Sequence, residues 1–473
     1  MSYEKRADYS VALLFPPALE DWIPADHPAR FIREFVDALD LEELGFHKRE
    51  AEEGRPNYAA DLMLKVWLYG YFSETRSVRK LERGCRDSVA LIWLTGMHEP
   101  DHNTLWRFWR DNKKAIRKLF VQAVRVAAKA NVVGALLQAL DGTKIQARAS
   151  RRTGVEKAEL ERLLDKIEKS FEQAGESETE EGYRLPEELT DRQELRERIK
   201  QALGEMEEMD REQLHPGERD ARMMKCGRGL EYGYNAQAVI DEASGLIVAA
   251  DVVNEESDND QLVPMIEQAK ENVGRAANQT VADGGYTSGE GLDGAEKLGH
   301  QVLVNLGPRH VGNENEYHAS RFSHDAPRDC WVCPLGKELK FEREKRNRRK
   351  RYAVRVYRCD SFQECPVRWE CSKDLRGRTI EITPYDGAFR RQREKLSEAH
   401  NQALLRKRMV IAEPVFGQIK HCFGFRRWTV GGLEGVKTQW SLVATAFNLR
   451  KLHRHWIAGR LSFDTGRLRF DTG

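Results

Sequence analysis

The sequence lacks a long uninterrupted apolar stretch. No run of apolar residues approaches the roughly 18–20 positions needed to cross a bilayer. The opening residues, MSYEKRADYSVALLF, contain neither the apolar centre of a secretion signal nor a small-residue cleavage site. These two absences predict a protein that makes no membrane contact and acts in the cytoplasm.

Cysteine is also scarce, with 8 in 473 residues. Thiols stay reduced in the cytoplasm, so a disulfide framework is not expected. Five of these residues nevertheless lie in one segment: Cys330, Cys333, Cys359, Cys365 and Cys371. A C-x-x-C pair followed by further cysteines suits a structural Zn²⁺ site. Only one pair has the tight spacing, and five candidates compete for four places, so buried or free thiols remain the alternative.

A net charge is almost absent as well, because 77 Lys and Arg residues balance 76 Asp and Glu residues. The charges are unevenly placed along the chain. Residues 156–212 are rich in acid, whereas residues 340–358 and 389–427 are strongly basic. Such asymmetry is typical of proteins that bind a polyanion, because phosphate contacts need local positive charge. A solvated charged surface is the alternative for any single basic run.

The chain is too long for a single compact core, and its pattern changes near residue 130. Apolar residues before this point recur at helical spacing, which predicts an all-helical N-terminal domain, residues 1–130, that binds DNA. The helices are expected over 31–39, 59–73, 78–85, 88–95 and 103–130.

Strand patterns alternate with helices from residue 131 to residue 455, which predicts a mixed α/β domain with a central sheet. Two segments read as insertions into it: a charged helical hairpin over 151–225, and an irregular, Cys-rich, basic segment over 307–384. The last residues, 456–473, carry a direct echo (GRLSFDTG, then GRLRFDTG) and are expected to be a disordered tail. Strands are expected over 132–140, 232–240, 246–253, 279–282 and 301–305, and helices over 260–273, 288–298, 403–422 and 436–455.

Three acidic residues occupy unusual places in this pattern. Asp141 follows an apolar strand, Asp283 ends another, and Glu413 interrupts an apolar and basic helix. Acids at the carboxyl ends of neighbouring strands lie close together at one edge of an α/β sheet. Carboxylates are the ligands that Mg²⁺ prefers, and two such ions can cut and join phosphodiesters. Each acid alone has an ordinary explanation as a turn cap or a solvated side chain.

The ordered set of motifs resembles the DDE-type transposases of bacterial insertion sequences, in particular the IS-eleven-eighty-two-type group. The resemblance covers nearly the whole chain. It rests on the following blocks: Gly54-Arg-Pro56, Leu68-Tyr-Gly-Tyr71, Arg76–Glu82, Pro100–Thr104, Leu140-Asp-Gly-Thr143, Tyr234-Asn-Ala-Gln237, Ala282-Asp-Gly-Gly-Tyr286, Arg408, Glu413–Lys420 and Gly424–Arg427.

This resemblance implies a ribonuclease-H-like catalytic domain in which Asp141, Asp283 and Glu413 hold two Mg²⁺ or Mn²⁺ ions. It also implies cleavage at transposon ends, followed by transfer of the freed 3′ hydroxyl into target DNA. Lys420, two helical turns after Glu413, would reach a phosphate near the metals. Arg408 precedes Glu413 by five positions rather than the family's four, so it points away from Glu413 and would serve DNA.

Further contacts with double-stranded DNA are expected from side chains near these blocks. Tyr286 would lie near the scissile DNA, with a packed aromatic as its alternative, and Trp428 would stack against bases, with a core position as its alternative. Relatives work as dimers that hold two DNA ends, so a homodimer is expected by analogy. Contacts with the DNA backbone are expected from Arg346, Arg348, Arg349, Lys350, Arg426 and Arg427.

Two rival functions stay open at this point. One is a ribonuclease-H-like nuclease that cuts DNA but does not join it. The other is a non-catalytic DNA-binding protein derived from a transposase, against which the intact set of three acids argues.

Overall fold

The computed structural model describes residues 18–46, 57–175, 187–227, 229–307, 316–346, 352–464 and 467–469. The chain divides into two compact units: Met1–Asn131 together with Ser441–Gly473, and Val132–Trp440. None of the described helices is long and apolar enough to cross a membrane.

The first unit is built from short helices, as the sequence predicts. Each buries an apolar stripe; α1, for example, buries Phe31, Ile32 and Phe35. The single helix expected over 103–130 is instead two, because the helix breaks at Asn112, whose side-chain amide donates to Phe108 O at 2.8 Å. The elements are η1 (Leu19–Trp22), α1 (Pro28–Asp37), α2 (Leu41–Leu44), α3 (Ala60–Phe72), α4 (Val78–Asp87), α5 (Val89–Thr95), α6 (His102–Asp111) and α7 (Lys113–Lys129).

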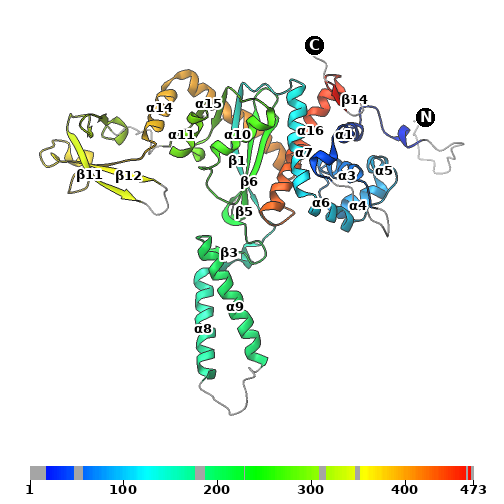
Figure 1. The fold of residues 1–473 in the computed structure, drawn as a ribbon, viewed down its shortest axis with the longest axis horizontal. Coiled ribbons are helices and arrows are strands. Elements are labelled where there is room, and N and C mark those ends of the chain that lie inside the picture. The colour runs from blue at the N-terminus through cyan, green and yellow to red at the C-terminus, as the bar shows by residue number, and fades with distance from the viewer. Residues whose placement is uncertain are drawn as a thin grey trace, which may run out of the picture. The chain divides into compact units, whose positions relative to one another are not determined.

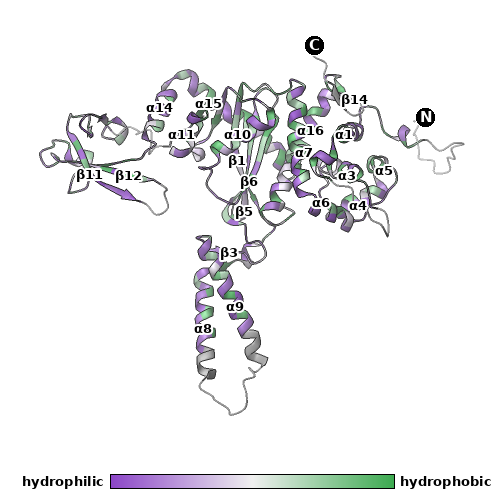
Figure 2. Cartoon of the chain, viewed as in Figure 1, coloured by the Kyte–Doolittle hydropathy of each residue, from purple (hydrophilic) through white to green (hydrophobic). Residues whose placement is uncertain are grey.

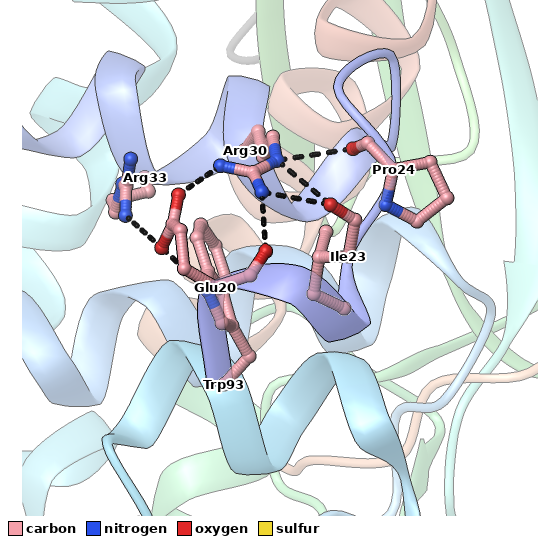
Figure 3. Close-up of polar contacts among 6 residues, drawn as sticks. All are labelled: Glu20, Ile23, Pro24, Arg30, Arg33 and Trp93. Carbon is pink, nitrogen blue, oxygen red and sulfur yellow. Dashed lines mark hydrogen bonds and ion pairs between the residues drawn. The ribbon is translucent and has the colours of Figure 1, made fainter. Parts of the chain in front are cut away.

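A polar network fixes the start of this unit against α1 and α5 (Figure 3). The Arg30 guanidinium donates to the backbone oxygens of Ile23 (2.7 Å) and Pro24 (3.0 Å) and pairs with the Glu20 carboxylate. The Trp93 indole N–H donates to the other Glu20 oxygen at 3.0 Å. Arg30 therefore donates hydrogen bonds to backbone carbonyls that lie outside any helix, and these bonds fix the chain that leads into α1.

The long helix α16 (Leu433–Ile457) supplies the last part of the first unit, because residues from Ser441 onward pack with the N-terminal helices. Arg450 Nε donates to Phe72 O at 2.8 Å, and the Trp456 indole donates to Glu34 Oε2 at 2.9 Å. Residues 441–455, which the sequence pattern assigns to the catalytic domain, thus pack with the N-terminal helices, and the extent of the catalytic domain stays a prediction.

Where the structure describes it, the segment expected to be a disordered tail contains two short strands. The two copies of the echo pair as antiparallel strands, β14 (Ser462–Asp464) and β15 (Arg467–Arg469). The Phe463 ring lies 5.7 Å from Phe31 and 6.3 Å from Phe35, measured between ring centroids. An aromatic anchor and strand pairing thus order a segment too short to fold by itself.

The second unit is centred on a six-stranded mixed sheet (Figure 1). Its order is β4-β5-β1-β7-β8, with β6 also paired to β5. The pairs β1–β5, β4–β5 and β5–β6 are antiparallel, whereas β1–β7 and β7–β8 are parallel. The strands are β1 (Leu137–Gln146), β4 (Arg222–Cys226), β5 (Gly229–Asp241), β6 (Ile247–Val253), β7 (Gln279–Ala282) and β8 (Gln301–Val304).

Helices α10 (Leu262–Val273) and α15 (Ala399–Gly417) contact this sheet, α10 on β6 and β5, and α15 on β1 and β7. Two further helices, α11 (Gly289–Lys297) and α14 (Asp386–Ser397), contact each other and β8. The strands are mostly hydrophobic in Figure 2 because they are covered by helices. Strand β1 continues through Asp141 to Gln146, although the sequence pattern predicts that the strand ends at Asp141.

The charged hairpin consists of α8 (Lys157–Gly175) and α9 (Glu187–Glu208), which are mostly hydrophilic in Figure 2. A narrow seam of Leu160, Ile167, Ile199 and Met206 holds the two helices together. Two short strands, β2 (Val155–Glu156) and β3 (Gln213–Leu214), pair at its base.

The segment expected to be irregular forms a second sheet instead, the Cys-rich lobe, described over residues 316–346 and 352–384. Its five antiparallel strands have the order β13-β12-β11-β10-β9. The charged side chains that follow Leu339 on β11 are exposed, so the strand lacks the apolar alternation by which a sequence reveals it. The elements are β9 (Ser323–Asp325), β10 (Cys330–Val332), β11 (Glu338–Arg346), β12 (Ala353–Cys359), α13 (Arg368–Cys371) and β13 (Thr379–Ile382).

Candidate active site

Asp141 and Asp283 stand side by side on neighbouring parallel strands. Leu140 of β1 is paired with Ala282 of β7, and each aspartate is the next residue of its chain. The two carboxylates are close enough that the charge of Asp283 raises the pKa of Asp141. Strand pairing therefore brings together two acids that are far apart in the sequence.

Asp141 is largely withdrawn from water and is paired with a cation. Its Oδ2 lies 2.7 Å from Arg408 Nη1 on α15, and its side chain is 15% exposed. Burial raises the pKa of Asp141 to about 6, against the opposing effects of Arg408 and of the Gly142 N–H. The site thus holds a partly dehydrated carboxylate whose charge one arginine only partly offsets.

A third acid, Asp258, joins these two, and the sequence reasoning missed it. It lies in the loop between β6 and α10, and its Oδ1 accepts hydrogen bonds from Asn235 Nδ2 (2.7 Å) and Gln237 Nε2 (2.6 Å). Its charge also raises the pKa of Asp141. The signal that points to it is the spacing of Asn235 and Gln237, two polar residues at period two on an otherwise apolar strand, which face one side together.

Two glycines make room for Asp258 between the other acids. A Cβ added at Gly142 would lie 3.0 Å from Asp258 Oδ1, and one added at Gly285 would lie 3.0 Å from Asp258 Oδ2. Each glycine adjoins or nearly adjoins one of the paired aspartates. The close approach explains why glycine is needed at both positions, since any side chain would push the carboxylate away.

The expectation that Tyr286 contacts DNA is wrong, and its alternative as a packed aromatic is right. The ring is fully buried, and its hydroxyl donates to Gln237 Oε1. Gln237 in turn orients Asp258, so Tyr286 supports the acidic site from behind. Burial, followed by the charges of Asp258, Asp141 and Asp283, raises the pKa of Tyr286 well above its usual value.

Helix α15 brings basic residues to the same place. Its buried face includes Ile411, Ala412 and Val415, and Arg408 lies on that face, which directs its guanidinium to Asp141. The helix ends in a π-helical turn, Gln418–Cys422, a local widening that is frequent at functional sites. Lys420 in this turn is half-buried, and burial lowers its pKa, although the charges of Cys226 and Asp141 oppose this effect.

Glu413 lies on the same helix but outside its buried face, and its side chain is exposed. Across the described ranges, no group of three or more His, Cys, Asp or Glu side chains is arranged to hold a metal ion as it stands. Asp141, Asp283 and Asp258 are nevertheless hard oxygen donors of the kind that a divalent cation prefers, and the charges of the latter two act on Asp141.

The other residues expected to bind DNA differ in where the structure places them. Trp428 is 1% exposed and its indole donates to Ile145 O at 3.1 Å, so the expectation that it stacks on bases is wrong and it belongs to the core. Arg427 donates to the backbone oxygens of Ala147 and Arg148, and thus fixes the chain after β1. Arg346 and Arg426 are exposed, whereas Arg348, Arg349 and Lys350 lie outside the described residues.

Two family models match this chain, one near each end. A model described as "Transposase domain (DUF772)" matches residues 17–111, within the helical unit. A model described as "Transposase DDE domain" matches residues 332–453, a range that includes Arg408, Glu413 and Lys420. No curated protein matches the chain. Both matches are to transposase domains, and they indicate a DDE transposase of the insertion-sequence type.

Proposed function

We propose that this transposase uses a ribonuclease-H-like domain to cut DNA at transposon ends and to transfer the freed ends into target DNA. The strand order supports this fold: β6, β5 and β1 are antiparallel neighbours, and β7 and β8 extend the sheet in parallel with β1. The observation that carries the proposal is that Asp141 and Asp283 lie next to each other. They directly follow Leu140 of β1 and Ala282 of β7, which are paired in the sheet.

Asp141, Asp283 and Glu413 are the proposed ligands of two Mg²⁺ or Mn²⁺ ions. When bound, such ions polarise a phosphodiester and lower the pKa of an attacking water or 3′ hydroxyl. The strand positions of Asp141 and Asp283 hold both carboxylates rigidly, which supports a fixed ligand geometry. Glu413 would be brought in from α15, which contacts both of these strands.

Arg408 has a different role in this proposal from the one that its sequence spacing suggests. Its ion pair keeps the buried Asp141 ionised before metal arrives. With a metal ion bound by Asp141, the Arg408 guanidinium would be able to donate two parallel hydrogen bonds to a phosphate of the DNA. Lys420 would contact a neighbouring phosphate from the π-helical turn.

DNA contacts away from the chemistry are proposed for Arg346 and Arg426, which are both exposed, and for the three basic residues from Arg348 to Lys350. These side chains would bind the phosphate backbone without reading sequence. Binding of two transposon ends by a homodimer is proposed by analogy with related enzymes.

The direct test replaces Asp283 with Asn. Cleavage of a DNA duplex carrying the element's ends should fall by at least about 10³-fold in Mg²⁺, while binding of the same duplex in a gel-shift assay stays unchanged. Asp165→Asn, on the exposed face of the helical hairpin, is the control and should behave as the unmodified protein. Persistent cleavage by the Asp283 variant would refute the metal-site assignment.

A second assay distinguishes a transposase from a nuclease that cannot join ends. Duplexes with pre-cut 3′ hydroxyl ends are supplied with a supercoiled plasmid, and covalent joining is measured. The proposal expects joined products that disappear in the Asp283→Asn variant. Cutting without any joining would leave only the nuclease activity.

A further inference from the structure

The Cys-rich lobe has a small core for its size. Seven buried residues form the cluster that holds its sheet together. Such a core is too small to stabilise a lobe of this length without a crosslink or a bound metal. The core residues are Phe322, Trp331, Leu339, Tyr357, Cys359, Phe362 and Ile380.

Strand register divides the five cysteines between the two faces of this sheet. Trp331, Leu339 and Cys359 are paired in one row across β10, β11 and β12, so their side chains share the core face. Cys330 belongs to the neighbouring row, opposite Lys340, and therefore points to the other face. Consistent with this placement, the charges that act on Cys330 are carboxylates and arginines, with Glu338 first among them.

Two of these sulfurs accept hydrogen bonds. The backbone N–H of Lys337 donates to Cys333 Sγ at 3.3 Å, within a turn in which Gly336 N also donates to Cys333 O at 2.9 Å. Cys333 also packs against the core cluster that contains Cys359. Burial raises the pKa of Cys359, although the backbone N–H and the hydroxyl of Ser361 donate to its sulfur and oppose this rise.

The remaining two cysteines approach the same place from the segment around α13. Cys371, at the end of this helix, is affected by the charges of Cys365, Cys333 and Cys359 together. Burial is the main cause that raises the pKa of Cys371, and the Arg378 guanidinium opposes it. Arg378 Nε is itself buried and has no hydrogen-bond partner within the described ranges. A cation so placed suits a site that carries excess negative charge.

We propose that Cys333, Cys359, Cys365 and Cys371 bind one structural Zn²⁺ ion and that Cys330 is not a ligand. Register places Cys359 on the core face and Cys330 on the opposite face. Cys333 packs against the cluster that contains Cys359, and the charge of Cys365 acts on both Cys359 and Cys371. These four are therefore chosen over Cys330 for the four tetrahedral places. The four side chains do not stand in ligand geometry in the described structure. Binding therefore requires rotation of the thiols about their own side-chain bonds and loss of four protons.

Metal content tests the assignment directly on the full-length protein. Protein purified from zinc-supplemented cells is analysed for zinc by mass spectrometry, for the unmodified chain and for five single Cys→Ser variants. The unmodified chain and Cys330→Ser should hold about one zinc per chain, and the other four variants less than half of that. Zinc-free unmodified protein that also fails to bind added Co²⁺ would refute the site.

A second measurement needs no variant and so stays informative if the substitutions disturb folding. The unmodified protein is alkylated with iodoacetamide before and after treatment with a zinc chelator, and each cysteine is followed by peptide mass spectrometry. The proposal expects the chelator to accelerate alkylation at all four ligand positions and to do so less at Cys330. Equal rates with and without the chelator would overturn it. Neither measurement depends on transposase activity.

Discussion

The two sheets of the second unit place polar side chains in opposite ways. The six-stranded sheet is covered by helices, and its polar residues form one oriented network that runs from Tyr286 through Gln237 to Asp258. The sheet of the Cys-rich lobe has a core cluster of only seven residues, and its polar residues include exposed ion pairs such as Arg355–Asp329. A large apolar core can hold a strained cluster of acids in place, whereas a small core cannot.

This contrast predicts that loss of zinc would unfold one sheet and spare the other. In the Cys371→Ser variant, the amides of β10, β11 and β12 should lose most of their protection in hydrogen exchange, since zinc supplies on the order of 10 kcal/mol to small zinc domains. The amides of β1 and β5 should be unchanged. Cys330→Ser is the matched control, and loss of protection in both variants would contradict the assignment of ligands.

The converse perturbation removes one large side chain from the core of the six-stranded sheet. Trp428 packs against Tyr234, Phe425 and Trp440, so Trp428→Ala should lower the free energy of unfolding by about 3–5 kcal/mol in urea titrations. Arg346→Ala should leave that free energy unchanged. If the Trp428 variant kept full stability but bound DNA more weakly, Trp428 would contact DNA after all, in contradiction to its burial.

Substitution of Asp258 tests whether this acid belongs to the active site. Asp258→Asn places an amide N–H₂ or a neutral oxygen against the donors of Asn235 and Gln237. DNA cleavage, or the apparent affinity for Mg²⁺, should fall by about 10–100-fold. Both quantities come from cleavage rates measured across a Mg²⁺ titration. Asp260→Asn, an exposed position in the same loop, is the control, and equal rates for the two variants would remove Asp258 from the site.

The smallest effect is expected at the back of the same network. Tyr286→Phe deletes the hydroxyl that donates to Gln237 and leaves the ring in place. The free energy of unfolding should fall by about 1 kcal/mol, measured by thermal or urea unfolding, and cleavage should change by only a few-fold. A loss of cleavage as large as that of Asp283→Asn would mean that Tyr286 contacts the reacting groups after all.

The sequence pattern predicted the secondary structure best where apolar periodicity is strong. Helix 260–273 and strand 279–282 correspond closely to α10 and β7. It failed for the Cys-rich lobe, since β11 exposes a run of charged residues and shows no apolar alternation. At residues 441–455 the spacing identifies the helix correctly but does not say which unit the helix packs against.

The residues of the candidate site also differ in how far the sequence could predict them. Asp141 and Asp283 could be singled out from their positions after apolar strands. Asp258 was missed because its own loop has no distinctive pattern, and the signal for it lies on β5, in the spacing of Asn235 and Gln237. Arg408 was expected to point away from the metal site by helical spacing relative to Glu413, yet its guanidinium pairs with Asp141 because α15 lies against β1.

By itself the sequence determined the chemistry available to this transposase: the acids, the thiols and the alternation of strands and helices are properties of local composition and spacing. Tertiary structure alone decided which of these groups meet. Parallel pairing of β1 with β7 joined two distant aspartates, and the register of β10, β11 and β12 placed Cys330 and Cys359 on opposite faces. The physical reason is that contacts across a sheet depend on pairing between segments, which no single segment encodes.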